Sequence, residues 1–217
     1  MQKILLYIVL FTLIPLFSIA QGRYTSNNKK AIKSYEEALV SFNRMDYANA
    51  ILLMQKAIKA DDQFIEAYLV LAEIYIDSGN NKMAIDSYLK AIKIDPDFAA
   101  SYAALGGIWS FLKQMNFVTT DQAAPHITPN IQKAKALDPD LAEVYYWDAI
   151  NLVWTDYNWD AGETAFIKAI DLNPNSSETR GLYSNFLLGQ NRIEKARKEM
   201  DIALLGIPSL QAAYLHP

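Results

Sequence analysis

The chain has 217 residues, of which 52% are apolar, and its 20 basic and 24 acidic residues give a formal net charge of −4. It therefore has enough apolar side chains for a packed core, and its acidic balance disfavours a nucleic-acid partner, which needs a basic surface. Cysteine is absent, which excludes disulfides, cysteine-based metal sites and thiol nucleophiles.

The first 20 residues have the layout of a secretory signal peptide. Lys3 precedes an apolar run from Ile4 to Phe17, and the small-residue exit Ser18-Ile19-Ala20 follows. A charge before a short apolar helix that ends in a small-x-Ala site is typical of a signal-peptidase substrate. We therefore expect residues 1–20 to be removed, residues 21–30 to form a linker, and the product to reach the periplasm or cell envelope without a membrane span.

The alternative is a membrane anchor that is not cleaved. The segment from Ile4 to Ala20 reaches the roughly 17 residues that a spanning helix needs. With either a cleaved signal peptide or an uncleaved anchor, we expect the rest of the chain to be exported.

From residue 31 onward the sequence repeats. Tyr68, Leu71, Ala72 and Tyr75 recur 34 residues later as Tyr102, Leu105, Gly106 and Trp109. Pro96, Pro139, Pro174 and Pro208 each follow an alanine by five residues, namely Ala91, Ala134, Ala169 and Ala203. Small residues let two antiparallel helices approach, aromatic rings fill the space between them, and proline ends the second helix.

This pattern resembles the tetratricopeptide-repeat (TPR) family, and the resemblance covers roughly residues 31–210. It implies an all-α fold, a right-handed α-solenoid of about five stacked helix-turn-helix units. The expected units are 31–64, 65–98, 99–141, 142–176 and 177–210.

The third unit is longer than the others, and its matches place the extra residues within 113–128. Pro125 and Pro129 fall in or beside this stretch, so we expect an inserted extended loop at 113–128 and a short second helix beginning near Thr128. Residues 211–217 have the pattern of a further first helix, which is truncated at Pro217.

Candidates for catalysis are few. The only histidines are His126 and His216, and His126 falls in the expected loop near Asp121, where a solvated loop residue is the favoured interpretation. No phosphate loop, Gly-x-Ser-x-Gly turn or His-Glu-x-x-His run is present. We therefore expect no enzyme activity, no catalytic residue, no metal and no cofactor.

The TPR resemblance implies a concave groove lined by the first helix of each unit, where a polypeptide partner binds. The positions that the resemblance assigns to this groove are Tyr35, Leu39, Phe42, Leu69, Glu73, Ile76, Tyr146, Ile150, Val153 and Asn185. They are mostly apolar and supply little positive charge, which favours a hydrophobic segment over an acidic tail. The competing interpretation is that the aromatic members pack between repeats.

The sequence thus favours a protein-protein interaction scaffold or adaptor in the bacterial cell envelope. The alternative is the repeat portion of a longer exported protein whose C-terminal domain binds cell wall or is catalytic. An unfinished helix pair at the C-terminal end is also a candidate surface for self-association.

Overall fold

The structure is a computed structural model, and it describes residues 24–205. Over that range the chain forms ten α-helices and no strand, which confirms the predicted all-α class. The helices are α1 (Lys29–Asn43), α2 (Tyr47–Ala60), α3 (Ile65–Asp77), α4 (Asn81–Ile94), α5 (Ala99–Gln114), α6 (Thr120–Leu137), α7 (Ala142–Trp154), α8 (Trp159–Leu172), α9 (Ser177–Gly189) and α10 (Ile193–Leu205). The expected signal peptide at 1–20 and the expected truncated helix at 211–217 lie outside the described residues.

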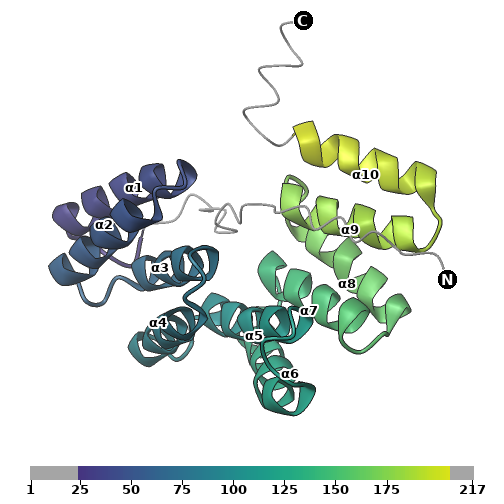
Figure 1. The fold of residues 1–217 in the computed structure, drawn as a ribbon, viewed down its shortest axis with the longest axis horizontal. Coiled ribbons are helices and arrows are strands. Elements are labelled where there is room, and N and C mark those ends of the chain that lie inside the picture. Colours follow the sequence, from purple (N-terminus) through teal and green to yellow (C-terminus); the bar gives the residue numbers. More distant parts are fainter. Residues whose placement is uncertain (1–23, 206–217) are drawn as a thin grey trace, which may run out of the picture.

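The helices are arranged as five stacked pairs. The most extensive contacts join α1 to α2, α3 to α4, α5 to α6, α7 to α8 and α9 to α10, and we number these pairs repeats one to five. Figure 1 shows the pairs following one another along an arc, with α1, α3, α5, α7 and α9 on its inner side and the even-numbered helices outside. We call the surface formed by the odd-numbered helices the inner face. The predicted repeat solenoid is confirmed.

A comb of buried alanines lets the two helices of each repeat approach closely. Its members are Ala57, Ala91, Ala134, Ala169 and Ala203, each at most 1% exposed. Three residues before each of the first four alanines lies a buried bulky side chain, namely Met54, Tyr88, Ile131 and Phe166. Burying a side chain of this size stabilises the fold by roughly 1.5–3 kcal/mol, so every repeat adds its own portion of the core.

The turn inside each repeat uses one residue in the left-handed backbone region. These residues are Met45, Gly79, Asn116, Tyr157 and Asn191, with φ between 55° and 80°. Glycine and asparagine adopt this conformation readily, whereas Met45 and Tyr157 do so at a cost of roughly 1–2 kcal/mol. The five turns therefore share this backbone feature, although their lengths and sequences differ.

The predicted loop at 113–128 is wrong, because most of that segment is helical. Helix α5 continues to Gln114 and α6 begins at Thr120, with Pro125 and Pro129 inside it. Thr119 caps the new helix in a reciprocal pair with Gln122. The buried side chains of α6 are Ala123, Ile127, Ile131 and Ala134, which share one face. Their burial against α5 offsets a cost of about 3 kcal/mol for each internal proline.

In the segment expected as a linker at 21–30, residues 24–28 are not helical, but they pack on the repeats. Helix α1 already begins at Lys29, and Asn28 caps it by accepting from two backbone N–H groups. The Tyr24 ring contacts Tyr35 and Phe64 at centroid distances of 5.4 and 5.6 Å. The Thr25 backbone N–H donates to a Glu66 carboxylate oxygen at 3.0 Å. Polar and aromatic side chains thus attach this segment to the first two repeats.

No helix within residues 24–205 has the length and hydropathy needed to cross a membrane.

Candidate functional site

The expected groove residues all lie on the odd-numbered helices, but most of them are packing residues. Buried members are Tyr35, Phe42, Leu69, Tyr146, Ile150 and Val153, and half-buried members are Leu39, Glu73, Ile76 and Asn185. A buried side chain meets a partner only if its neighbours move. The accessible part of the expected set is therefore the second, smaller group.

Glu73 is the most unusual member of that group. It lies on α3, and its Oε2 atom is buried and accepts no hydrogen bond from any described residue. Burial raises the pKa of Glu73 well above the ordinary value, and the negative charges of Asp77, Glu178 and Glu143 raise it further. A buried carboxylate without a donor costs free energy, so this side chain is poorly satisfied by the chain itself.

The carboxylates that act on Glu73 come from three inner helices. Asp77 lies one turn further along α3, Glu143 lies in the first turn of α7, and Glu178 lies in the first turn of α9. Burial raises the pKa of Asp77 to about 6 and is also the main cause of the raised pKa of Glu143. We call Glu73, Asp77, Glu143 and Glu178 the acidic cluster.

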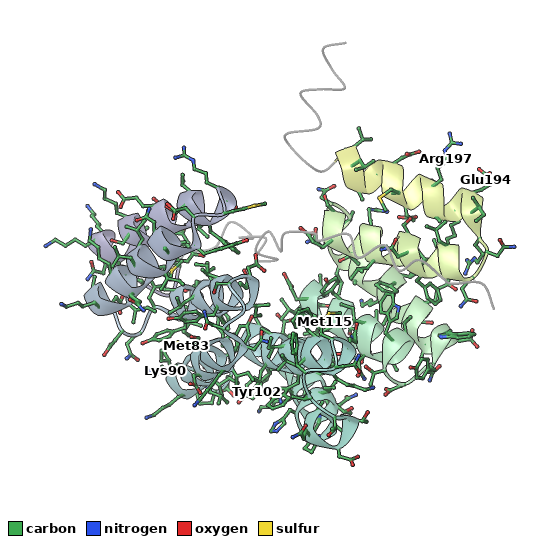
Figure 2. The ribbon with its side chains drawn as sticks, in the orientation of Figure 1. Met83, Lys90, Tyr102, Met115, Glu194 and Arg197 are labelled. Carbon is green, nitrogen blue, oxygen red and sulfur yellow. The ribbon has the colours of Figure 1, made fainter. Side chains whose placement is uncertain are left out.

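Within the described residues, no lysine or arginine forms an ion pair with the acidic cluster. Arg180 is only two residues from Glu178, yet it pairs with Glu199 on α10. Lys90 on α4 and Arg197 on α10 lie on outer helices (Figure 2). The inner helices also carry lysines, on α1 and at Lys113 on α5, but none of them pairs with the acidic cluster. The carboxylates of the cluster are therefore not balanced by an ion pair within residues 24–205.

Three buried tyrosines are under the electrostatic influence of the acidic cluster. Burial raises the pKa of Tyr35, Tyr88 and Tyr146. Glu73 raises the pKa of Tyr35 and Tyr88 further, and Glu178 does so for Tyr146. The three rings are each at most 5% exposed, so the groups that feel the negative charge of the cluster are buried.

Of the acidic cluster, only Glu73 was among the expected groove residues, whereas Asp77, Glu143 and Glu178 were not predicted. A signal was present, because Glu66, Glu143 and Glu178 are each the second residue of their helix, α3, α7 and α9. Residues in one register of a repeat protein lie on one face. Charges at recurring positions therefore predict a charged stripe, whereas single residues do not.

A second polar group joins the last two repeats. The Tyr183 hydroxyl donates to Glu163 at 2.7 Å, and Arg192 Nη1 and Lys195 Nζ lie 2.6 and 3.3 Å from the same carboxylate. The hydrogen bond from Arg192 is the main cause that lowers the pKa of Glu163 to about 2. We call these four residues the Glu163 network. All its charged groups are paired, so it connects α8, α9 and α10 and is not an open site.

His126 is not the loop residue that the sequence predicted. It lies on α6, exposed to solvent, and its ring stacks on Trp109 with centroids 4.2 Å apart. Among residues 24–205 no three histidine or acidic side chains are placed to hold a metal ion. Pairing with an aromatic ring is therefore the one role that the geometry gives to His126.

The chain is similar to several known proteins. A sequence model described as TPR repeat matches residues 72–108. The Sol locus transcriptional repressor of Clostridium acetobutylicum is 33% identical over 84 residues, which cover 35% of this chain and 26% of the repressor. The matched region is thus about a quarter of that relative's length.

Solved structures resemble the fold over most of the chain. A thermophilic TPR protein of Thermus thermophilus has a TM-score of 0.71 at 17% identity, with 85% of this chain and 97% of that chain covered. PilW, a type IV pilus biogenesis factor, has a TM-score of 0.62 at 19% identity, with 82% and 78% covered. MamA from Desulfovibrio magneticus RS-1 has a TM-score of 0.51 at 15% identity, with 87% and 98% covered.

These identities are low, so the likeness concerns the fold. The sequence match at residues 72–108 falls on α3, α4 and α5, where the repeat pattern is most regular. Five helix pairs, the buried alanine comb and this match agree, and the chain is a tetratricopeptide-repeat protein.

Proposed function

We propose that the chain is a protein-binding scaffold that holds a polypeptide segment on its inner face. The observation that supports this most directly is the row of five inner helices along one side of the arc (Figure 1). A segment laid across such a face contacts side chains from several repeats at once, which is how repeat proteins build extended binding surfaces. Leu39, Ile76 and Asn185 supply accessible apolar and polar contacts on that face.

Residue-specific crosslinking tests this proposal. A photoreactive amino acid placed at Leu39, Ile76 or Asn185 is expected to capture one and the same polypeptide in cells. The matched controls carry the reactive group at Met83, which Figure 2 labels, or at Leu89. These residues are 47% and 48% exposed on the outer helix α4. Capture of that polypeptide from the outer positions alone, or from both faces equally, contradicts binding on the inner face.

We also propose that the protein works in the cell envelope. The signal-peptide layout of residues 1–20 supports this, and so does the likeness of the fold to PilW, which acts in pilus biogenesis. Cell fractionation with N-terminal sequencing of the product is the test. A chain that begins after Ala20 and is recovered from the periplasm supports the proposal, whereas an intact N-terminus in the cytoplasm contradicts it.

A further inference from the structure

We propose that the inner face recognises a basic polypeptide segment, whose lysine or arginine side chains bind at the acidic cluster while apolar neighbours contact the flanking residues. This inference rests on the proposed function, because it names the chemistry of the partner on that same face. Nothing in the sequence match or in the likeness of the fold assigns a charge preference to this chain.

The first observation is the unsatisfied oxygen of Glu73. Its Oε2 atom is buried and has no donor among the described residues, whereas most buried polar atoms in folded proteins are hydrogen-bonded. Among residues 24–205 no lysine or arginine pairs with it, and Arg180 is engaged with Glu199. A donor from outside would satisfy this atom, and a positively charged donor would also relieve the repulsion among the carboxylates.

The second observation is how the charges are distributed. They come from α3, α7 and α9, that is from repeats two, four and five. The described residues contain no group of three carboxylates close enough to hold a metal ion. One compact cation therefore does not fit, because a calcium ion needs six to eight oxygen ligands around it. Several positive charges spaced along an extended chain fit this distribution.

The third observation is the apolar surroundings of the charges. Ile76 lies between Glu73 and Asp77 on α3 and is half-buried. The rings of Tyr35, Tyr88 and Tyr146 are buried close to the carboxylates. Lysine and arginine have long aliphatic stems that lie well on such surfaces while their charged ends reach a carboxylate. The inner face thus suits basic side chains better than a purely apolar segment.

The experiment compares three short, end-capped synthetic peptides in a binding titration with the purified full-length chain. The first alternates leucine with lysine, and the other two carry glutamine or glutamate at every lysine position. The lysine peptide is expected to bind at least about tenfold more tightly than the glutamine peptide, and the glutamate peptide is expected to bind most weakly. Equal affinities for the lysine and glutamine peptides would overturn the charge preference.

Two triple variants locate the binding site. Glu73→Gln, Glu143→Gln and Glu178→Gln together remove three charges from the inner face and keep the shape of the side chains. Asp86→Asn, Asp171→Asn and Glu194→Gln remove the same number of charges from exposed positions on α4, α8 and α10. The first variant is expected to lose the preference for lysine and the second to retain it. Loss in both variants, or in neither, contradicts recognition at the acidic cluster.

The same titrations separate this inference from the proposed function. In one outcome, the lysine and glutamine peptides bind equally, and Leu39→Asp and Ile76→Asp weaken the binding of both. That result would support binding on the inner face but contradict the charge preference. Binding by none of the peptides, to a chain whose helical circular dichroism is normal, would contradict both.

Discussion

Glu73 and Glu163 are both half-buried glutamates, but their surroundings are opposite. Glu163 accepts from a tyrosine and lies against an arginine and a lysine, and its pKa is lowered to about 2. Glu73 has an oxygen without a donor and three carboxylates nearby, and its pKa is raised. The Glu163 network satisfies itself within repeats four and five. The acidic cluster is left incomplete by its own chain, as binding and catalytic groups often are.

The two regions also differ in how they depend on the contact between α5 and α7. The acidic cluster includes helices on both sides of that contact, whereas the Glu163 network lies wholly on one side. A Cβ atom added at Gly107 on α5 would overlap the ring of Trp147 on α7. Perturbing this contact should therefore disturb one region and spare the other.

Gly107→Ala is expected to have the largest effect, lowering the free energy of unfolding by about 2–3 kcal/mol, because overpacking outweighs the helix-propensity gain of about 1 kcal/mol. Chemical denaturation measures the loss, and NMR titration should show that the pKa of Glu73 changes while that of Glu163 stays low. The control is Gly189→Ala, where an added Cβ meets nothing within 4 Å. Equal effects of the two substitutions would contradict the proposed overlap.

Glu163→Gln comes next, with an expected loss of about 1.5 kcal/mol, since it weakens two partly exposed ion pairs and a hydrogen bond. Hydrogen exchange should increase most in α10, which Arg192 and Lys195 connect to α8. Asp201→Asn is the matched control, because its pair with Arg197 is 3.9 Å long and both side chains are more than 60% exposed. An increase in hydrogen exchange confined to α1–α4 would contradict a stabilising role of the Glu163 network.

Glu73→Met should act in the opposite direction and raise the free energy of unfolding at neutral pH by about 1 kcal/mol. The reason is that an apolar side chain of similar size carries neither the buried charge nor the unsatisfied oxygen. Thermal denaturation by circular dichroism is the measurement. A lower midpoint than in the wild type would show that Glu73 is satisfied after all, and would weaken the inference about a basic partner.

The smallest expected effect is on the pH dependence of stability. Glu163, with a lowered pKa of about 2, contributes stability that is complete above the ordinary glutamate pKa and is lost as pH falls toward 2. Asp77, with a pKa raised to about 6, favours the folded chain at low pH and loses that contribution as pH rises from about 4 to 6.

Stability should therefore be highest near pH 4, where these two windows meet. Midpoints of thermal unfolding measured across the pH range test this expectation. Asp77→Asn should flatten the decline between about pH 4 and 6, and Glu163→Gln should flatten the acid side alone. If the two variants had identical profiles of stability against pH, the acidic cluster and the Glu163 network would not differ in their pH dependence as expected.

Much of the fold could be predicted because the repeat places small and bulky residues at fixed intervals. The alanines that precede Pro96, Pro139 and Pro174 all proved to be buried where two helices meet. The second half of α6 agrees with the short helix expected from near Thr128, whereas its first half, from Thr120, was not predicted because two prolines lie in this region. The capping pair of Thr119 and Gln122 and the apolar face with Ala123, Ile127 and Ile131 four residues apart are the sequence signals for the earlier start.

The acidic cluster could be predicted only in part. Glu73 follows from the resemblance, and the shared register of Glu143 and Glu178 was available. The closeness of these charges to α3 was not available, since it depends on how far the stacked pairs curve. The sequence indicates which residues share a face of the solenoid, but the curvature of the stacked repeats decides which of those residues come close together.

Contacts in this chain join mainly neighbouring helices, and α5 and α7 are the inner helices that contact each other extensively. Within residues 24–205 no extensive contact joins the first repeats to the last ones, so the array can flex along its arc. A polypeptide that binds α3, α7 and α9 together would connect repeat two to repeats four and five, which share no extensive contact with it in that range. The partner would then set the span between the two ends of the arc, and anything attached to those ends would change its separation when the partner binds.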